Sequence, residues 1–458
     1  MKDNKTKELA AFVSALRFDD LPAPVVHQAC RFLLDALGCA IGAFREDERK
    51  ASLVQELVRR LGTGGGCTIV RCGDAHPAIA ALGNGMLINA TDNDDTNKRA
   101  LVHVGSVVVP SALAMTEQRG GSGRDLITAL VAGYEVAARV GMAVMPSHYR
   151  FWHSTATNGT FGAAAAAGRA MNLDTECMVT AFGFAGTQAA GLNTFFESGD
   201  DTKALHPGKA GFNGVLSAEM AACGLTSPPD IFGHPKGYLA AYSLDARPEM
   251  LTRGLRSEWM ILHNGFKYYP SILASHSPIG ASIDIHRRSG FDASLVKAVT
   301  VKTYATVKSH FSSTRVDTAM AARLSVPYCV AVALVDGEVR QRQFTPGRYG
   351  NAMVRAVMNK VQIVADEALT KLYPEQFPAQ VTVDLRDGRS FSAEMYYPKG
   401  DPSNPLSDAE LETKFRLNAE GLLAGEQIDE MVDLVFHLST ITDMTRLSAL
   451  LSCGHKSP

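Results

Sequence analysis

The stretch from residue 161 to residue 171 constrains the fold most strongly, because it consists almost entirely of glycine and alanine. Alanine favours helix, and helices that carry only small side chains can approach one another closely. Residues 214–223 repeat this character. The two segments therefore predict helices that pack closely in the interior of a bundle.

Two further segments carry apolar side chains at helical spacing. Residues 24–43 begin next to prolines, and residues 125–145 follow the sequence Gly-Gly-Ser-Gly-Arg. Proline favours the first turn of a helix, and apolar residues every three or four positions are typical of a helix with a buried face. Residues 1–265 are therefore predicted to form a mostly helical domain.

After residue 265 the sequence contains patterns that are typical of β-strands. Residues 295–307 alternate and are rich in β-branched side chains, which predicts a strand, and residues 379–397 are predicted to be a β-hairpin that turns at Asp-Gly. Helical patterns at 319–335 and 350–360 lie between them. Residues 266–400 are therefore predicted to be an inserted α+β domain.

The C-terminal segment is predicted to return to the helical domain. Residues 401–405, Asp-Pro-Ser-Asn-Pro, have the composition of a linker, and Ser407 with Glu410 matches a capping box that starts a helix. Residues 401–458 would then complete the first domain. The predicted fold class is mostly α with an inserted α+β domain.

Composition and charge argue against several classes of protein. The net charge of −2 provides no basic field for nucleic acid or anionic lipid, and no run of about 18 apolar residues predicts a membrane span. The first eight residues are polar and lack the apolar core of a signal peptide. A cytoplasmic protein without nucleic-acid or membrane partners is therefore expected.

Eight cysteines, of which Cys453 is the last, are spread along the chain without a Cys-x-x-Cys pair. Zinc and iron–sulfur sites usually group their cysteine ligands. The cysteines are therefore expected to be reduced and mostly buried thiols. No metal and no other cofactor is predicted.

Residues 92–96, Asp-Asn-Asp-Asp-Thr, and His103 carry the most chemical information. Three carboxylates, a hydroxyl and an imidazole fall within twelve positions, and apolar sequence runs on both sides. Charge within apolar sequence is costly unless it is paired or used in function. The simpler alternative is an exposed acidic loop whose residues cap helices.

Three later segments also place a histidine or lysine beside apolar or aromatic sequence. They are residues 151–155 (Phe-Trp-His-Ser-Thr), residues 203–211 (Lys-Ala-Leu-His-Pro-Gly-Lys-Ala-Gly) and residues 266–271 (Phe-Lys-Tyr-Tyr-Pro-Ser). In order and spacing, the four segments resemble the signature segments of the MmgE/PrpD family. The resemblance extends from Leu-Leu-Asp-Ala-Leu-Gly at 33–38 to Pro-Lys-Gly-Asp-Pro near 398.

This resemblance implies a fold and a chemistry. The family includes 2-methylcitrate dehydratase, cis-aconitate decarboxylase and iminodisuccinate epimerase. Its members have an all-helical domain completed by the C-terminus and a smaller lid-like domain, and they are dimers, so a homodimer is implied. Their substrates are small di- or tricarboxylates, from which a proton or CO2 leaves a carbon next to a carboxylate.

Four residues that match the family pattern supply cations and proton transfer. Lys203 and Lys267 are assigned to binding substrate carboxylates, because an ammonium group is a compact point charge. His103 and His153 are assigned as the proton-transfer pair, because histidine titrates near neutral pH. Which of the two histidines is the base and which is the acid stays open.

Three more residues are assigned through the resemblance. Asp92 would orient a histidine or hold a proton, Thr96 would hydrogen-bond the substrate, and Tyr328 would contact substrate near the pocket. By pattern alone, Tyr328 is a core aromatic on a helix. Ile272 stands where the family's decarboxylase carries a pocket histidine, which argues against decarboxylation.

The leading hypothesis is a cofactor-independent hydro-lyase that acts on a small di- or tricarboxylate such as a 2-methylcitrate-like hydroxy acid. The alternatives are an epimerase or isomerase of a dicarboxylate, a cis-aconitate-type decarboxylase, and a catalytically silent relative that binds an acid or a partner protein. The leading hypothesis and the two reactive alternatives all develop charge next to a carboxylate, and a base, an acid and cations promote such reactions.

Overall fold

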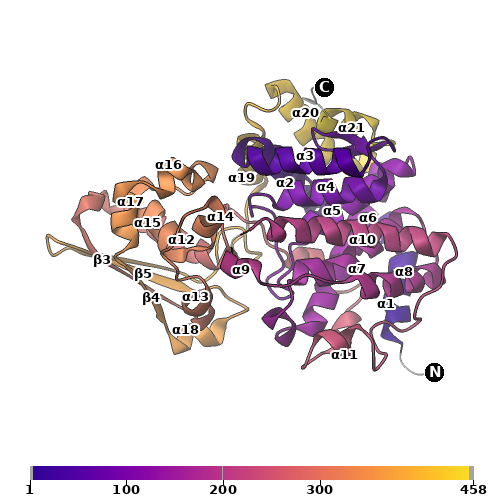
Figure 1. The fold of residues 1–458 in the computed structure, drawn as a ribbon, viewed down its shortest axis with the longest axis horizontal. Helices are drawn as coiled ribbons and strands as arrows, with labels where there is room; N and C mark the ends of the chain where they lie inside the picture. The colour runs from indigo at the N-terminus through magenta and orange to yellow at the C-terminus, as the bar shows by residue number, and fades with distance from the viewer. Residues whose placement is uncertain (1–3, 199, 453–458) are drawn as a thin grey trace.

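The computed structural model describes residues 4–198 and 200–452, which form a large helical part and a smaller part built on a sheet (Figure 1). Residues between 9 and 266 make one hydrophobic core together with residues between 406 and 451. Residues between 269 and 385 make a second core. The mostly helical fold with a smaller α+β part is confirmed, whereas the boundaries of the predicted domains stay a prediction.

Small residues let the central helices of the larger part pack closely. A Cβ atom added to Gly162 of α7 would lie 2.6 Å from the Cβ of Ala137 in α6, and one added to Gly214 of α10 would overlap Ala163 of α7. The close packing predicted for both glycine- and alanine-rich segments is confirmed. The α-helices are α1 (Lys5–Ala15), α2 (Ala23–Glu46), α3 (Glu48–Leu61), α4 (Pro77–Asn89), α5 (Gly105–Gln118), α6 (Gly123–Val144), α7 (Ser154–Ala170), α8 (Thr175–Gln188), α9 (Phe195–Ser198), α10 (Thr202–Ala222), α11 (Tyr238–Tyr242), α19 (Asp408–Ala419), α20 (Gly425–Phe436) and α21 (Thr445–Ser452).

The two longest helices, α2 and α6, are core helices. α6 begins after Ser122, whose side chain forms a capping box with Asp125. Both helices are long and apolar enough to cross a membrane by length and composition, yet most of each apolar stretch is buried inside the protein, as in any core helix. The helices predicted at 24–43 and 125–145 are confirmed.

The helices after residue 407 pack on the large helical part. Ser407 accepts a hydrogen bond from the backbone of Glu410 and starts α19 with the predicted capping box. α19 packs against α2, so the C-terminal helices lie on the large helical part (Figure 1). The extent of the predicted return, residues 401–458, stays a prediction, and Cys453 lies outside the described residues.

The smaller part is built on a mixed four-stranded sheet in the order β4-β3-β5-β6. β3 is parallel to β4 and antiparallel to β5, which pairs with β6 in the predicted hairpin. Helices α12, α15 and α17 lie on one side of this sheet (Figure 1). The strands are β3 (Val296–Thr303), β4 (Val361–Ala365), β5 (Ala379–Leu385) and β6 (Ser390–Met395), and the helices are α12 (His276–Ser289), α13 (Ala305–His310), α14 (Ala319–Leu324), α15 (Val326–Asp336), α16 (Pro346–Tyr349), α17 (Ala352–Met358) and α18 (Glu367–Leu372).

Local sequence explains where the predicted elements differ from the observed ones. The predicted strand at 295–307 ends at Thr303, and α13 follows. The predicted helix at 319–335 is two helices, because Ser325 caps α15 and Pro327 lies in its first turn. The strand β4 and the short antiparallel pair β1 (Cys67–Ile69) and β2 (Gly73–Ala75) were not predicted.

Candidate active site

The acidic segment lies in the loop between α4 and α5, and it is buried. Asp92, Asp94 and Asp95 are at most 1% exposed, and His103 is 8% exposed. Asp92 adopts a left-handed backbone conformation with φ +55°, which is costly for a residue with a side chain. The alternative of an exposed acidic loop is therefore wrong, and the loop holds its carboxylates inside the protein.

Asp95 anchors this loop to three other segments. One of its carboxylate oxygens accepts a hydrogen bond from the backbone N–H of Gly105 at 2.8 Å, and the other accepts from Tyr134 Oη at 3.0 Å and from Asn264 Nδ2. Burial and the nearby carboxylate of Asp94 raise the pKa of Asp95 well above its usual range. Asp95 therefore ties the loop to α5, to α6 and to the segment that leads to Lys267.

The close approach at Gly105 predicts a stability effect. A Cβ atom at this position would overlap the Asp95 carboxylate. Gly105→Ala is therefore expected to lower the free energy of unfolding by about 1–3 kcal/mol, as overpacking in a core does. Denaturant unfolding measures this, with Gly425→Ala as the control, because a Cβ at Gly425 meets nothing within 4 Å. Equal stability of the two variants would contradict the role of Asp95 as an anchor.

Two lysines far apart in sequence meet on one oxygen of Asp92. Lys203, from the first turn of α10, and Lys267 each place Nζ 2.6 Å from Asp92 Oδ1. Lys267 also donates to the backbone carbonyl of Asp92 at 3.2 Å. Burial opposes ionisation of Asp92, but the two ammonium groups hold its pKa well below its usual range, while burial lowers the pKa of Lys267.

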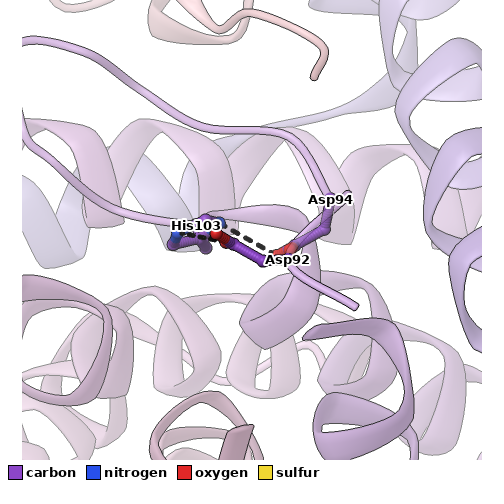
Figure 2. A group of neighbouring side chains, drawn as sticks. All are labelled: Asp92, Asp94 and His103. Atoms are coloured by element: carbon purple, nitrogen blue, oxygen red, sulfur yellow. Dashed lines mark ion pairs between the residues drawn. The ribbon is translucent and has the colours of Figure 1, made fainter. Parts of the chain in front are cut away.

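His103 lies between two carboxylates of the same loop. Its Nδ1 is 3.2 Å from Asp94 Oδ2 and its Nε2 is 3.7 Å from Asp92 Oδ1. Figure 2 shows the three side chains directed toward one another. Burial and the two lysines lower the pKa of His103, whereas Asp94 opposes this shift. Asn89 donates a hydrogen bond to the other oxygen of Asp94, Oδ1, at 2.8 Å and fixes this carboxylate.

His153 lies next to this group at the start of α7. Its ring centroid is 6.4 Å from that of His103. Its Nδ1 is 2.9 Å from Nδ1 of His206, which follows Lys203 by three residues on α10. Burial, His206 and Lys203 hold the pKa of His153 well below its usual range, so its ring is neutral at pH 7. Five predicted residues, Asp92, His103, His153, Lys203 and Lys267, therefore lie together in one buried cluster.

The remaining predicted residues take different positions. Thr96 lies on the same loop, where its hydroxyl donates to the carbonyl of Val102 at 3.3 Å. Tyr328 is buried in the core of the smaller part, and its hydroxyl donates to the carbonyl of Gln343. Within residues 4–198 and 200–452, no described hydrogen bond or ring contact joins Tyr328 to the buried cluster. Its assignment to substrate binding stays a prediction.

A second buried ion pair supports the loop and was not predicted. Lys414 of α19 lies 2.6 Å from Asp35 of α2 and donates to the backbone carbonyl of Asn93 at 2.7 Å. Lys414 and Asp35 are both almost fully buried. The sequence offers one local signal for this pair, because Asp35 and Lys414 each place a charge on the buried face of a helix. Through this hydrogen bond α19 holds Asn93, the residue next to Asp92, in place.

A cavity of about 530 Å³ opens between the helical part and the smaller part close to this cluster. Its lining includes Asn93 and Tyr268, which directly follow Asp92 and Lys267 in the sequence, and also Arg340 and Lys414. Arg340 donates to the Tyr268 hydroxyl at 3.1 Å. Arginines, Lys414 and three glutamates all line the cavity, which reaches the sequence neighbours of two residues of the buried cluster.

Asp92, Asp94 and His103 offer ligand atoms close enough together to hold a metal ion. Such an ion would lie against the ammonium groups of Lys203 and Lys267, which repel it and already occupy Asp92 Oδ1. Activity is therefore expected to be unchanged after treatment with a chelator and dialysis, measured as the initial rate. Loss of activity that one specific metal restores would contradict this expectation.

Comparison with known proteins covers both parts of the chain. A family model for the MmgE/PrpD N-terminal domain matches residues 7–251, and a model for the MmgE/PrpD C-terminal domain matches residues 269–438. These two ranges coincide with the two hydrophobic cores over most of the chain.

Three curated relatives are similar over nearly their full length. A cis-aconitate decarboxylase of Aspergillus terreus (strain NIH 2624 / FGSC A1156) is 28% identical, over 100% of this chain and 98% of the relative. The cis-aconitate decarboxylase-like protein oryM of Aspergillus oryzae is 28% identical, over 98% and 97%. The cis-aconitate decarboxylase of Homo sapiens is 26% identical, over 97% and 94%. With both family models matched in order along the chain, this protein belongs to the MmgE/PrpD family.

Proposed function

We propose that the protein is a lyase that acts on a small di- or tricarboxylate by removing a proton next to a carboxylate. The observation that carries this proposal is the buried cluster in which Lys203 and Lys267 share one oxygen of Asp92 beside two histidines. Buried charges cost stability even when they are paired, which supports their retention for function. The cis-aconitate decarboxylases among the relatives give independent support for a tricarboxylate substrate.

The geometry fits the electrostatics of this reaction. Removing a proton next to a carboxylate spreads negative charge onto that carboxylate as an enolate-like species. Lys203 and Lys267 would hold it, because preorganised cations in a water-poor site stabilise developing charge far better than water does. A substrate carboxylate would share the two ammonium groups with Asp92. The cavity lined by Asn93 and Tyr268 would admit the substrate.

Two lyase reactions are candidates, and only the first begins by removing a proton. Dehydration of a 2-methylcitrate-like hydroxy acid is the leading one, because Ile272 takes the place of a histidine that the resemblance assigns to decarboxylation. Decarboxylation is the second candidate, because the relatives carry that activity in their names. Both develop negative charge next to a carboxylate. Dehydration does so by removing a proton and then loses hydroxide, whereas decarboxylation does so by losing CO2 and then adds a proton to the carbon.

A panel of di- and tricarboxylates, followed by NMR in deuterated water, tests the proposal. Dehydration is expected to give a new C=C bond with absorbance in the ultraviolet, and decarboxylation gives CO2. The His103→Ala variant serves as the blank for contaminating activities. Exchange of a substrate proton for deuterium without net reaction would assign an epimerase instead. Inertness toward the whole panel would overturn the proposal and favour a silent relative.

A further inference from the structure

His153 and His206 form a hydrogen bond that constrains both rings. The two Nδ1 atoms lie 2.9 Å apart, and the ring centroids lie 5.0 Å apart. One Nδ1 must carry the proton and the other must offer its lone pair, because two N–H groups or two lone pairs would repel each other. Both rings are neutral at pH 7, since burial lowers the pKa of His206 to about 4 and holds the pKa of His153 well below its usual range.

Two neutral rings joined by this hydrogen bond can place their protons in two ways. In the first, His153 carries its proton on Nδ1 and His206 carries its own on Nε2, so Nε2 of His153 is a free base. In the second, the protons are reversed and Nε2 of His153 is a donor. The bond to His206 occupies Nδ1 of His153 in both cases, so Nε2 is the only nitrogen of His153 that can meet a substrate.

The surrounding charges favour the first arrangement. The groups that act on His206 are Lys209, Lys203 and Asp200. A carboxylate that faces an imidazole nitrogen stabilises a proton there, and no described ion pair joins a carboxylate to His206. The charged and titratable groups that act on His153, besides His206, are Lys203, His103 and Asp92. His153 has no carboxylate within ion-pair distance among the described residues, whereas each ring nitrogen of His103 faces one.

We propose that His206 is a positioning residue that holds His153 with its proton on Nδ1 and its lone pair on Nε2, which makes His153 the base and His103 the acid. This assignment rests on the proposed function and decides between the two roles that the sequence left open. His153 Nε2 takes the proton from the substrate carbon, whose electron pair stays on the substrate. His103, held between Asp94 and Asp92, gives its proton to the leaving hydroxyl or to the product carbon.

NMR of the nitrogens of labelled histidines tests the tautomer directly. In the wild-type protein, His153 is expected to show a protonated Nδ1 and an unprotonated Nε2 at neutral pH, and His153→Gln assigns its signals. His206→Leu removes the acceptor, so the two tautomers of His153 should mix. His206→Asn should restore the wild-type pattern, because its amide oxygen can accept the same bond. His310→Asn is the control, since His310 is exposed on α13.

Kinetics provide a second readout that a purely structural role would not move. His206→Leu is expected to lower kcat by about 10²-fold, the lower end of what a general base contributes, with KM nearly unchanged because both lysines remain. His206→Asn should recover most of this loss. An unchanged melting temperature in both variants shows that the fold is intact.

The outcomes separate this inference from the proposed function. A protonated Nε2 on wild-type His153, or an unchanged tautomer in His206→Leu, would overturn the role of His206 even in an active enzyme. An inert wild-type protein with the expected tautomer would overturn the proposed function and with it the assignment of base and acid, while the hydrogen bond itself would stand.

Discussion

His103→Ala is expected to lower kcat by about 10²–10⁴-fold, the range that a proton-transfer group contributes. The reason is that His103 is assigned as the acid, and each of its ring nitrogens faces a carboxylate of the Asp92 loop that favours a proton there. Initial rates and the melting temperature of the purified variant measure the effect. The fold should persist, because the loop keeps its anchor through Asp95.

His310→Ala, on the surface of α13, is the matched control and should keep wild-type turnover. A His103→Ala variant with near-normal kcat would show that proton transfer takes place elsewhere. A variant that fails to fold would be replaced by His103→Gln, which retains a polar side chain, and the same loss of kcat is expected.

Lys267→Ala is expected to lower kcat/KM by about 10- to 100-fold through both a higher KM and a lower kcat. A hydrogen bond to a charged group contributes about 1.5–3 kcal/mol, and the substrate carboxylate would lose one such partner in the ground state and in the transition state. Steady-state kinetics over a range of substrate concentrations measure both constants. The exposed Lys308→Ala is the control and should change neither constant.

Lys267→Met separates charge from packing. It keeps most of the stem of the side chain, so it leaves less of a cavity than alanine does, and it should show the same loss of kcat/KM. Wild-type KM in both variants would show that Lys267 does not bind the substrate. In that case its contact with Asp92 would serve only to balance a buried charge.

The helical part was predictable because its signals are local. The prolines and the apolar spacing of α2, and the Ser122 capping box of α6, act within a few residues of each helix start. β4 was missed because its five residues follow a helix directly and its parallel partner, β3, lies more than 50 residues earlier. β1 and β2 have three residues each, too few for an alternating pattern.

The site was predictable in its residues and not in its contacts. Asp92, His103 and Lys267 each interrupt apolar or aromatic sequence, where charge is costly, and the family resemblance of their segments assigned them to the site. The shared oxygen of Asp92 joins residues 175 positions apart, and no local pattern encodes that distance. His206 was not predicted as a site residue, although it lies in the same short segment as Lys203. One helical turn separates the two residues, so both lie on one face of α10.

A crystal structure of the protein with a bound tricarboxylate tests the central claim most directly. We expect a substrate carboxylate within hydrogen-bond distance of Nζ of both Lys203 and Lys267, next to His103 and His153. Binding of the tricarboxylate elsewhere would contradict this, for example in the separate cavity of about 480 Å³ lined by several arginines, while the lysine cluster stays unchanged.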